Sequence, residues 1–116
     1  MSKRKPYIAR RADWARDAGW NGGWDGAAAG TNVSFIFSEQ TEAGLGPKLH
    51  SHDYDEVQIV RRGRAHFRVG DQEISAEEGD ILVIPAGTPH LVRSVGELSD
   101  VISVHLTDVK RATWLE

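Results

Sequence analysis

Residues 44–63 read GLGPKLHSHDYDEVQIVRRG and residues 79–90 read GDILVIPAGTPH, and these two stretches decide the fold and the site. Together they supply three imidazoles and one carboxylate, from His50, His52, Glu56 and His90. Nitrogen and oxygen ligands of this kind suit a divalent first-row transition metal. Burying four such groups in a small domain without a cation would be costly, which also favours a metal site. The spacing leaves the ion open among Fe, Mn, Ni, Zn and Cu, because affinity follows the Irving–Williams order whatever the native metal.

The spacing of the four ligands also predicts the path of the chain. His50 and His52 are two residues apart, so in a strand both side chains project to one face and can share an ion. Glu56 would lie roughly 13 Å beyond His52 if that strand simply continued. We therefore expect residues 53–55 to turn the chain and return Glu56 on a neighbouring strand. His90 then arrives on a later strand, placed by the rigid corner PAGTP that precedes it.

The remainder of residues 32–116 predicts an all-β domain. Short β-rich runs recur between Gly and Pro turns, a pattern typical of a sandwich or small barrel. Gly70-Asp71 indicates a hairpin, and turns are also expected at Arg62-Gly63 and Gly96-Glu97. Ile81–Ile84 is continuously apolar, which predicts burial on both faces. The expected strands are 33–37, 45–52, 56–60, 65–69, 72–75, 81–84, 90–94 and 101–106.

Residues 1–31 predict a short irregular N-terminal arm. Asp13–Gly19 fits one or two helical turns with Asp13 as N-cap, and Gly19–Gly30 is expected to be loop because it carries five glycines. Trp20 and Trp24 in that loop either pack on the barrel or a partner subunit or form a binding surface, and we favour packing. At the other end, residues 107–116 predict a tail that Trp114 and Leu115 pin to the body.

Composition limits the class of protein. The chain has 116 residues, which predicts one domain with a modest core, and its lack of cysteine suits a reducing cytosol. No apolar run approaches the length of a transmembrane helix, and no apolar segment follows the basic N-terminus as in a secretory signal. Residues 1–16 carry six Lys or Arg against one Asp. A basic arm can touch nucleic acid, but without interleaved aromatic residues we favour a solvated or self-packed tail.

At the two quoted stretches the chain resembles the cupin superfamily, and most of all its small stand-alone bacterial members with a cupin_2-type barrel. The resemblance covers roughly residues 32 to 106. It implies a double-stranded β-helix, or jelly-roll barrel, in which His50, His52, Glu56 and His90 fall on the usual metal-ligand positions. Ser94 departs from the family pattern, which usually has an Asn there. That Asn is not a ligand, so the departure concerns loop geometry.

Strand parity suggests further residues for the pocket. Lys48 shares the parity of His50, so its ammonium either holds a substrate carboxylate at the mouth or extends into solvent. Gln58 shares the parity of Glu56 and is expected to point inward. Val101, Ser103 and His105 form one face of the last strand. If that face is the inner one, His105 either contacts one of the metal-ligating side chains or serves as general acid or base. Otherwise it is a hydrogen-bonded residue of the barrel wall. We expect His66 to point outward, and we assign no role to Tyr54.

The family resemblance implies a metal-dependent enzyme of dioxygenase, decarboxylase or isomerase type acting on a small oxygenated or carboxylate-bearing molecule. The alternatives are a non-catalytic ligand-binding or sensing module and a structural metal-bearing barrel, and fold alone does not choose among them. We expect a cytoplasmic homodimer, with Val57, Ile59 and Ile81–Ile84 offering the faces that a partner buries. Neither nucleic acid nor membrane is an expected partner.

Overall fold

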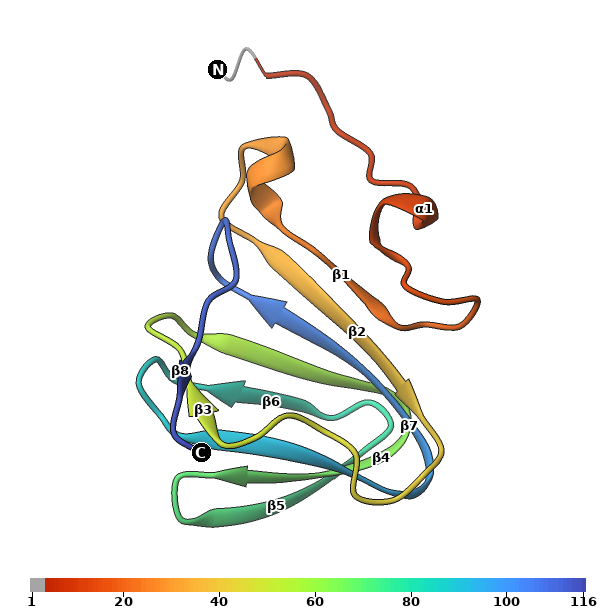
Figure 1. The fold of residues 1–116 in the computed structure, drawn as a ribbon, viewed down its shortest axis with the longest axis vertical. Coiled ribbons are helices and arrows are strands. Elements are labelled where there is room, and N and C mark those ends of the chain that lie inside the picture. Colours follow the sequence, from red (N-terminus) through yellow and green to blue (C-terminus); the bar gives the residue numbers. More distant parts are fainter. Residues whose placement is uncertain (1–3) are drawn as a thin grey trace.

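The computed structural model describes residues 4–116, and most of its regular structure is strand (Figure 1). This confirms the all-β prediction. Two helical turns, α1 (Arg11–Trp14) and the 3-10 turn Gly26–Ala29, lie in the N-terminal part of the chain. The strands are β1 (Gly22–Trp24), β2 (Ser34–Gln40), β3 (His50–Ser51), β4 (Glu56–Val69), β5 (Gln72–Glu77), β6 (Ile81–Ile84), β7 (His90–His105) and β8 (Thr113–Trp114).

Two long strands, β4 and β7, form the spine of the sheet. They pair antiparallel from Glu56↔His105 to Val69↔His90, and the sheet curls around them into a half-open barrel (Figure 1). On the other side of β4 lie β5 and β6, while β2 pairs with the second half of β7. The hairpin predicted at Gly70-Asp71 joins β4 to β5, which confirms it.

The turns predicted at Arg62-Gly63 and Gly96-Glu97 are wrong, because both strands continue through these positions. Register shifts on either side of Gly63 show that it lies in a bulged part of β4. Gly63 has φ of +73°, and a Cβ added there would lie 1.7 Å from the carbonyl oxygen of Leu98. Glycine at this position therefore bends the strand and admits the close approach of β7 without ending the sheet.

Alternation along the strands separates an inner face from an outer face. The inner face carries the core cluster of Val60, Ala65, Phe67, Ala76 and Val101. The predicted burial of Ile81–Ile84 on both faces is wrong, since Ile81 is 67% exposed and Val83 is 55% exposed. Among the described strands β6 pairs only with β4, so nothing covers its outward side chains.

The N-terminal arm contains more order than the sequence predicted. The helical turn begins before Asp13, whose carboxylate accepts a hydrogen bond from the Arg10 backbone N–H at 2.7 Å, so Asp13 is not the N-cap. The expected loop at 19–30 contains β1, which adds to the sheet beside β2. Packing of the tryptophans is confirmed: on the outer face of β2 the ring of Trp20 lies 6.0 Å from that of Phe37, and the ring of Trp24 lies 6.2 Å from that of Phe35. The ring of Trp14 also packs there, 4.3 Å from that of Phe37.

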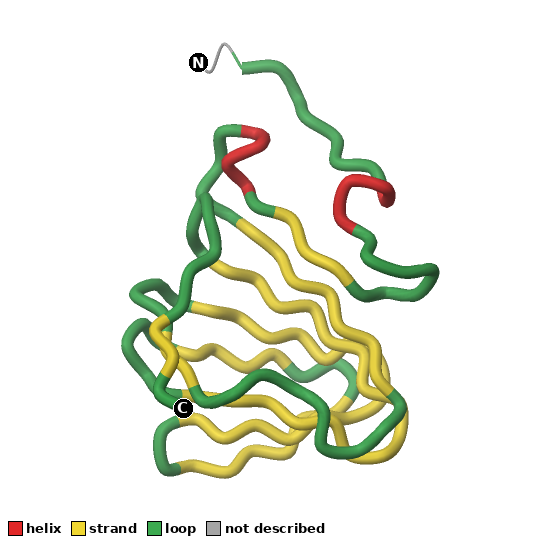
Figure 2. The backbone as a smooth tube through the Cα atoms, viewed as in Figure 1, coloured by secondary structure: helices red, strands yellow, loops and turns green. Residues whose placement is uncertain are grey.

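Residues 107–116 form a segment that we call the C-terminal strap. It runs across the open end of the barrel, and its strand β8 pairs with β3 (Figure 2). The Leu115 backbone N–H donates to the carbonyl of Leu49 at 3.0 Å, and the Trp114 ring lies 5.0 Å from the His50 ring. The predicted pinning of the tail by these two residues is confirmed. None of the helices within residues 4–116 is long and apolar enough to cross a membrane.

Candidate metal centre

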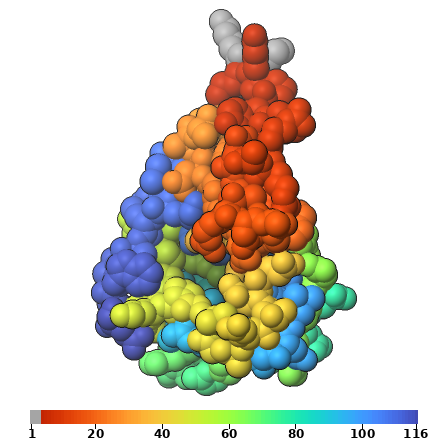
Figure 3. Space-filling model, turned by 45° about the vertical axis from the view of Figure 1, so that its right-hand side comes forward, coloured from red at the N-terminus to blue at the C-terminus, as the bar shows by residue number. Residues whose placement is uncertain are grey.

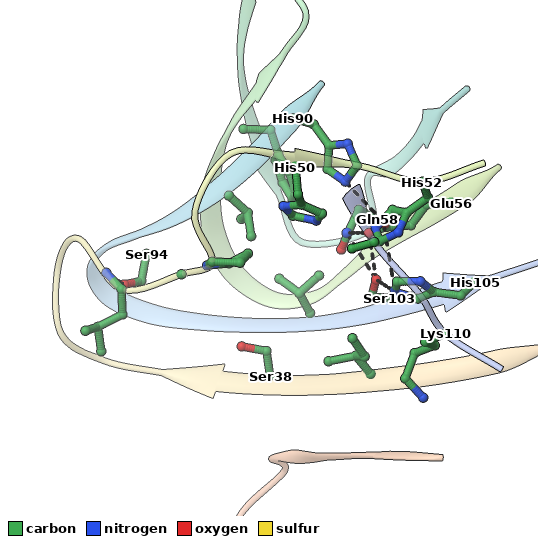
Figure 4. A pocket seen from close by; sticks show the side chains of 18 of the residues that line it. Ser38, His50, His52, Glu56, Gln58, His90, Ser94, Ser103, His105 and Lys110 are labelled. Carbon is green, nitrogen blue, oxygen red and sulfur yellow. Dashed lines mark hydrogen bonds and ion pairs between the residues drawn. The ribbon is translucent and has the colours of Figure 1, made fainter. Parts of the chain in front are cut away.

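The curled sheet brings the four predicted ligands together. His50 lies in β3 beside its register partner His90 at the start of β7, and Glu56 begins β4 after a bend at residues 53–54. The candidate ligand atoms of His50, His52, Glu56 and His90 all lie within 4.8 Å of one another, and all four residues are buried (Figure 4). The turn that the spacing required between His52 and Glu56 is therefore present.

Backbone carbonyls fix the orientation of all three imidazoles. The Nδ1 of His50 lies 2.7 Å from the Lys48 carbonyl oxygen, and the Nδ1 of His90 lies 2.8 Å from that of Thr88. The Nδ1 of His52 lies 2.6 Å from the carbonyl of Arg111 in the strap. A carbonyl oxygen only accepts hydrogen bonds, so each Nδ1 carries a proton and donates it. In the neutral tautomer that these contacts select, each ring presents the lone pair of its Nε2 to the cluster, as a metal ligand does.

The environment of His52 shows that the cluster fits a cation. Its Nε2 is buried and has no hydrogen-bond partner among the described residues, although Glu56 Oε1 lies only 2.9 Å away. With the proton held on Nδ1, the Nε2 lone pair and the carboxylate oxygen are two acceptors facing each other. Such a contact is unfavourable unless a positive charge lies between them. The donor set of three imidazoles and one carboxylate supplies the ligands for a divalent transition metal.

The pKa values of the cluster residues indicate which of them carries a negative charge. Burial raises the pKa of Glu56, but close contacts with His52 and His90 outweigh it and hold the pKa far below its usual range. Burial, with the nearby His90 and His52, lowers the pKa of His50. For His90 burial also lowers the pKa, yet the contacts with Glu56 and Thr88 outweigh it and raise the pKa overall. The cluster therefore holds one fixed negative charge, on Glu56.

A chain of hydrogen bonds fixes the orientation of the Glu56 carboxylate through its Oε2 atom. Ser103 Oγ donates to Glu56 Oε2 at 2.8 Å, and the Gln58 amide donates to the same oxygen. Ser103 also lies 2.9 Å from His105 Nε2, and His105 Nδ1 lies 2.7 Å from the Tyr54 hydroxyl. Burial lowers the pKa of His105 to about 4, so this ring is neutral at physiological pH. These contacts leave Glu56 Oε1 as the oxygen that faces the histidines.

A cavity of about 410 Å³ opens beside the four ligands. Figure 3 looks onto a hollow of the surface between the blue strap and the yellow segment that follows β2. The cluster occupies one end of the cavity wall, and Ser94 lies at the far end in Figure 4. Beyond the four ligands, the wall is formed by Ile36, Ser38, Gln40, Leu45, Gly46, Pro47, Gln58, Phe67, Val92, Ser94, Ser99, Val101, Ser103, His105, Lys110, Arg111, Ala112 and Trp114.

The other predicted pocket residues divide into two groups. Gln58 and His105 are buried and line the cavity, so Val101, Ser103 and His105 do form the inner face of the last strand. Lys48 is exposed and is not part of the lining, which agrees with the solvent alternative, although its carbonyl orients His50. A substrate contact by Lys48 stays a prediction. His66 points outward, as expected, and contacts Glu73.

Four further residues contribute to the site in ways that the sequence did not show. Tyr54, which had no assigned role, holds His105 and donates to the Arg111 carbonyl at 3.1 Å. Lys110 and Arg111 of the strap line the cavity, though a tail at the end of the chain gave no sign of this. Ser94, the departure from the family motif, accepts from the Leu45 N–H at 3.0 Å and donates to the Glu42 carbonyl, so it fastens the segment that precedes the ligands.

Comparison with known proteins decides the family. The family described as "Cupin domain" matches residues 38–105 of this chain. The chain belongs to the cupin family. Among solved cupin structures, a conserved barrel domain protein from Rhodopseudomonas palustris is 22% identical with a TM-score of 0.64, covering 73% of this chain and 59% of that one. A deletion mutant of oxalate decarboxylase from Bacillus subtilis is 16% identical with a TM-score of 0.76, covering 97% of this chain and 34% of that one. Both likenesses show the fold.

A curated relative adds sequence identity over about half of the chain. Acireductone dioxygenase 1 of Pectobacterium atrosepticum is 38% identical to this chain over 61 residues, which is 49% of this chain and 35% of the relative. The chain therefore spans about a third of the length of this dioxygenase and of the oxalate decarboxylase. The buried cluster of three histidines and one glutamate gives this cupin a possible metal site.

Proposed function

We propose that this cupin is a metal-dependent enzyme of the dioxygenase kind, acting on a small oxygenated molecule bound in the cavity. The observation that carries the proposal is the unpartnered Nε2 of His52, which faces a carboxylate oxygen in a cluster that opens to a 410 Å³ cavity. The named activity of the Pectobacterium relative favours dioxygenase chemistry over decarboxylation, because the oxalate decarboxylase likeness is one of fold. Decarboxylase and isomerase activities are the alternatives for the same site.

In this proposal His50, His52, Glu56 and His90 hold the metal. An ion held by these four residues would supply Lewis-acid chemistry to the oxygen atoms of a substrate. Ser103 and Gln58 keep Glu56 oriented toward the three histidines. His105 lines the cavity with its Nε2 3.9 Å from Glu56 Oε1, and it is the neutral imidazole that can take a substrate proton and return it.

The test is metal analysis of freshly purified protein, followed by an oxygen electrode with a panel of small enediols, diketones, phenols and carboxylates. We expect bound metal near one equivalent and oxygen uptake with at least one class. Release of carbon dioxide without oxygen uptake would favour a decarboxylase. Tight binding without turnover would favour the sensing alternative, and protein that takes up no metal would contradict the proposal outright.

We also propose a homodimer that buries the outer face of the sheet. Two apolar rows cross this face, with Val57 paired to Val83 and Ile59 paired to Ile81. Ile81 and Val83 are more than half exposed, and β6 is an edge strand that presents unpaired backbone groups. Sedimentation at micromolar concentration should show a dimer, and Ile81→Lys should shift it toward monomer. A monomeric wild-type protein would contradict the proposal.

A further inference from the structure

We propose that the substrate has a singly charged, oxygen-chelating head and an uncharged apolar tail, with the tail lying between Ile36 and Val92. The inference rests on the proposed function in one respect, namely that the head meets a metal held by the four ligands. The remainder follows from the charges and side chains of the cavity wall.

The net charge at the metal end of the cavity would be neutralised by one negative charge on the substrate. Glu56 is the charged ligand, so a divalent ion in the cluster leaves a net charge of one positive unit. Lys110 Nζ lies 2.5 Å from Asp25 Oδ1 and donates to the Trp24 carbonyl at 3.1 Å. Arg111 pairs with Asp53 at 2.8 Å. These are the two Lys or Arg side chains in the described lining, and each already has its own carboxylate. The wall therefore offers no free ammonium or guanidinium to a second negative charge on the substrate.

The other end of the cavity is apolar. Ile36 on β2 and Val92 on β7 both line it, and Figure 4 shows carbon-only side chains between the histidines and Ser94. The polar groups at that end are neutral, and Ser94 is already engaged with the backbone at Leu45 and Glu42. The further residues of the apolar wall are Leu45, Pro47, Phe67 and Val101. An alkyl or aryl group fits this surface, since each buried methylene strengthens binding by roughly fourfold.

The size of the cavity argues against a small dianion. A water molecule takes about 30 Å³ of liquid, so 410 Å³ exceeds what a two-carbon ligand fills. Oxalate would leave the apolar end empty and would bring two negative charges to a centre that balances one. The substrate of the structurally similar oxalate decarboxylase is therefore not the kind of molecule that this wall favours.

Hydroxamates test the inference because they are singly charged oxygen chelators with a variable tail. Protein loaded with Ni²⁺, with metal content verified, is titrated calorimetrically with acetohydroxamate, hexanohydroxamate and oxalate. We expect hexanohydroxamate to bind about 100- to 300-fold more tightly than acetohydroxamate, since it adds four methylenes at roughly fourfold each. Oxalate should bind no more tightly than acetohydroxamate. Equal affinity of the two hydroxamates, or tighter binding of oxalate, would overturn the inference.

Variants of the apolar wall locate the tail. Ile36→Asn should abolish the preference for the longer hydroxamate, and Ile36→Leu should keep the preference. Val92→Asn provides the same test from β7 if Ile36→Asn does not fold. A preference that survives both asparagine substitutions would place the tail elsewhere and overturn the inference. These titrations need no turnover, so a metal-loaded protein without tail preference contradicts the inference alone. A protein that binds no metal contradicts the proposed function and the inference together.

Discussion

The N-terminal arm and the C-terminal strap are both short segments that press tryptophans onto the barrel, yet they meet opposite faces of the sheet. The arm lays Trp14 and Trp20 on the outer face, where their rings contact Phe37. The strap crosses the inner side, where Trp114 joins the wall of the cavity. The arm thus covers apolar surface, whereas the strap closes the site.

The kind of contact differs as much as its place. The arm is held by the pairing of β1 with β2, by ring packing, and by Arg61, which lies 4.0 Å over the Trp20 ring. The strap acts through its backbone, because the Arg111 carbonyl accepts from both His52 and Tyr54. Loss of arm contacts should therefore cost stability, and loss of strap contacts should cost the geometry of the metal centre.

The largest effect is expected where the strap meets the ligands. His52→Ala should abolish stoichiometric metal binding, because it removes both an Nε2 ligand and the anchor to Arg111. Chelation of wild-type protein should lower the melting temperature, whereas the variant should melt alike with and without chelator. Ser51→Ala, at the neighbouring position, is the matched control and should retain metal. A variant that still binds one equivalent would show that His52 is not a ligand.

Removal of the strap should have the next largest effect. Truncation after Val109 deletes the carbonyl that orients His52, and loss of such a partner typically lowers metal affinity about 10- to 100-fold. Competition with a chromophoric chelator measures the change, and circular dichroism checks that the sheet persists. If the truncated chain folds and binds metal as wild type does, the strap is a cover without a positioning role.

Acid should also lower the stability of the fold, through protonation of His105. The folded pKa of His105 is about 4, below the usual value near 6.5, so between these pH values the unfolded chain binds a proton that the folded chain does not. Stability is therefore fully present above pH 6.5 and falls by up to about 3 kcal/mol as pH drops through this window. Urea unfolding of metal-free protein at pH 7, 5.5 and 4.5 measures the slope. In His105→Gln the slope should be shallower by the contribution of this ring, and an identical slope would show that His105 does not cause it.

The smallest of these effects belongs to the arm. Trp14→Ala removes a half-buried ring from Phe37 and should lower the free energy of unfolding by about 2 kcal/mol. Metal affinity should stay within about twofold of wild type, since the ring lies on the other face of the sheet. Trp14→Phe, which keeps an aromatic contact, should recover most of the loss. A large fall in metal affinity in Trp14→Ala would erase the distinction between arm and strap.

The family motifs carry most of what the sequence could predict. Strand parity placed His50 beside His52, and the distance to Glu56 required the bend that the structure contains. Parity also grouped Ser103 and His105 on one face of the last strand, and the structure shows that this face is the inner one. These predictions succeed because side chains alternate along a strand wherever the strand runs.

The features that the sequence could not show depend on backbone atoms and on the position of each strand in the sheet. The carbonyl of Arg111 orients His52 across 59 positions of sequence, and a carbonyl leaves no residue-type signature. Gly63 indicates a turn as readily as the bulge that it forms, because both use the same positive φ. Ile81–Ile84 reads as a buried strand, yet its exposure follows from its place at the edge of the sheet.

The position of Trp114 gives the protein an optical reporter of its own site. Its ring lies 5.0 Å from that of His50. On the outer face, by contrast, Trp14 and Trp20 contact each other and Phe37, and Trp24 contacts Phe35. An open-shell ion such as Cu²⁺ held by His50 would quench the nearby indole most strongly. The emission of this chain should therefore separate into a component that follows occupancy of the site and a steadier one that serves as an internal reference.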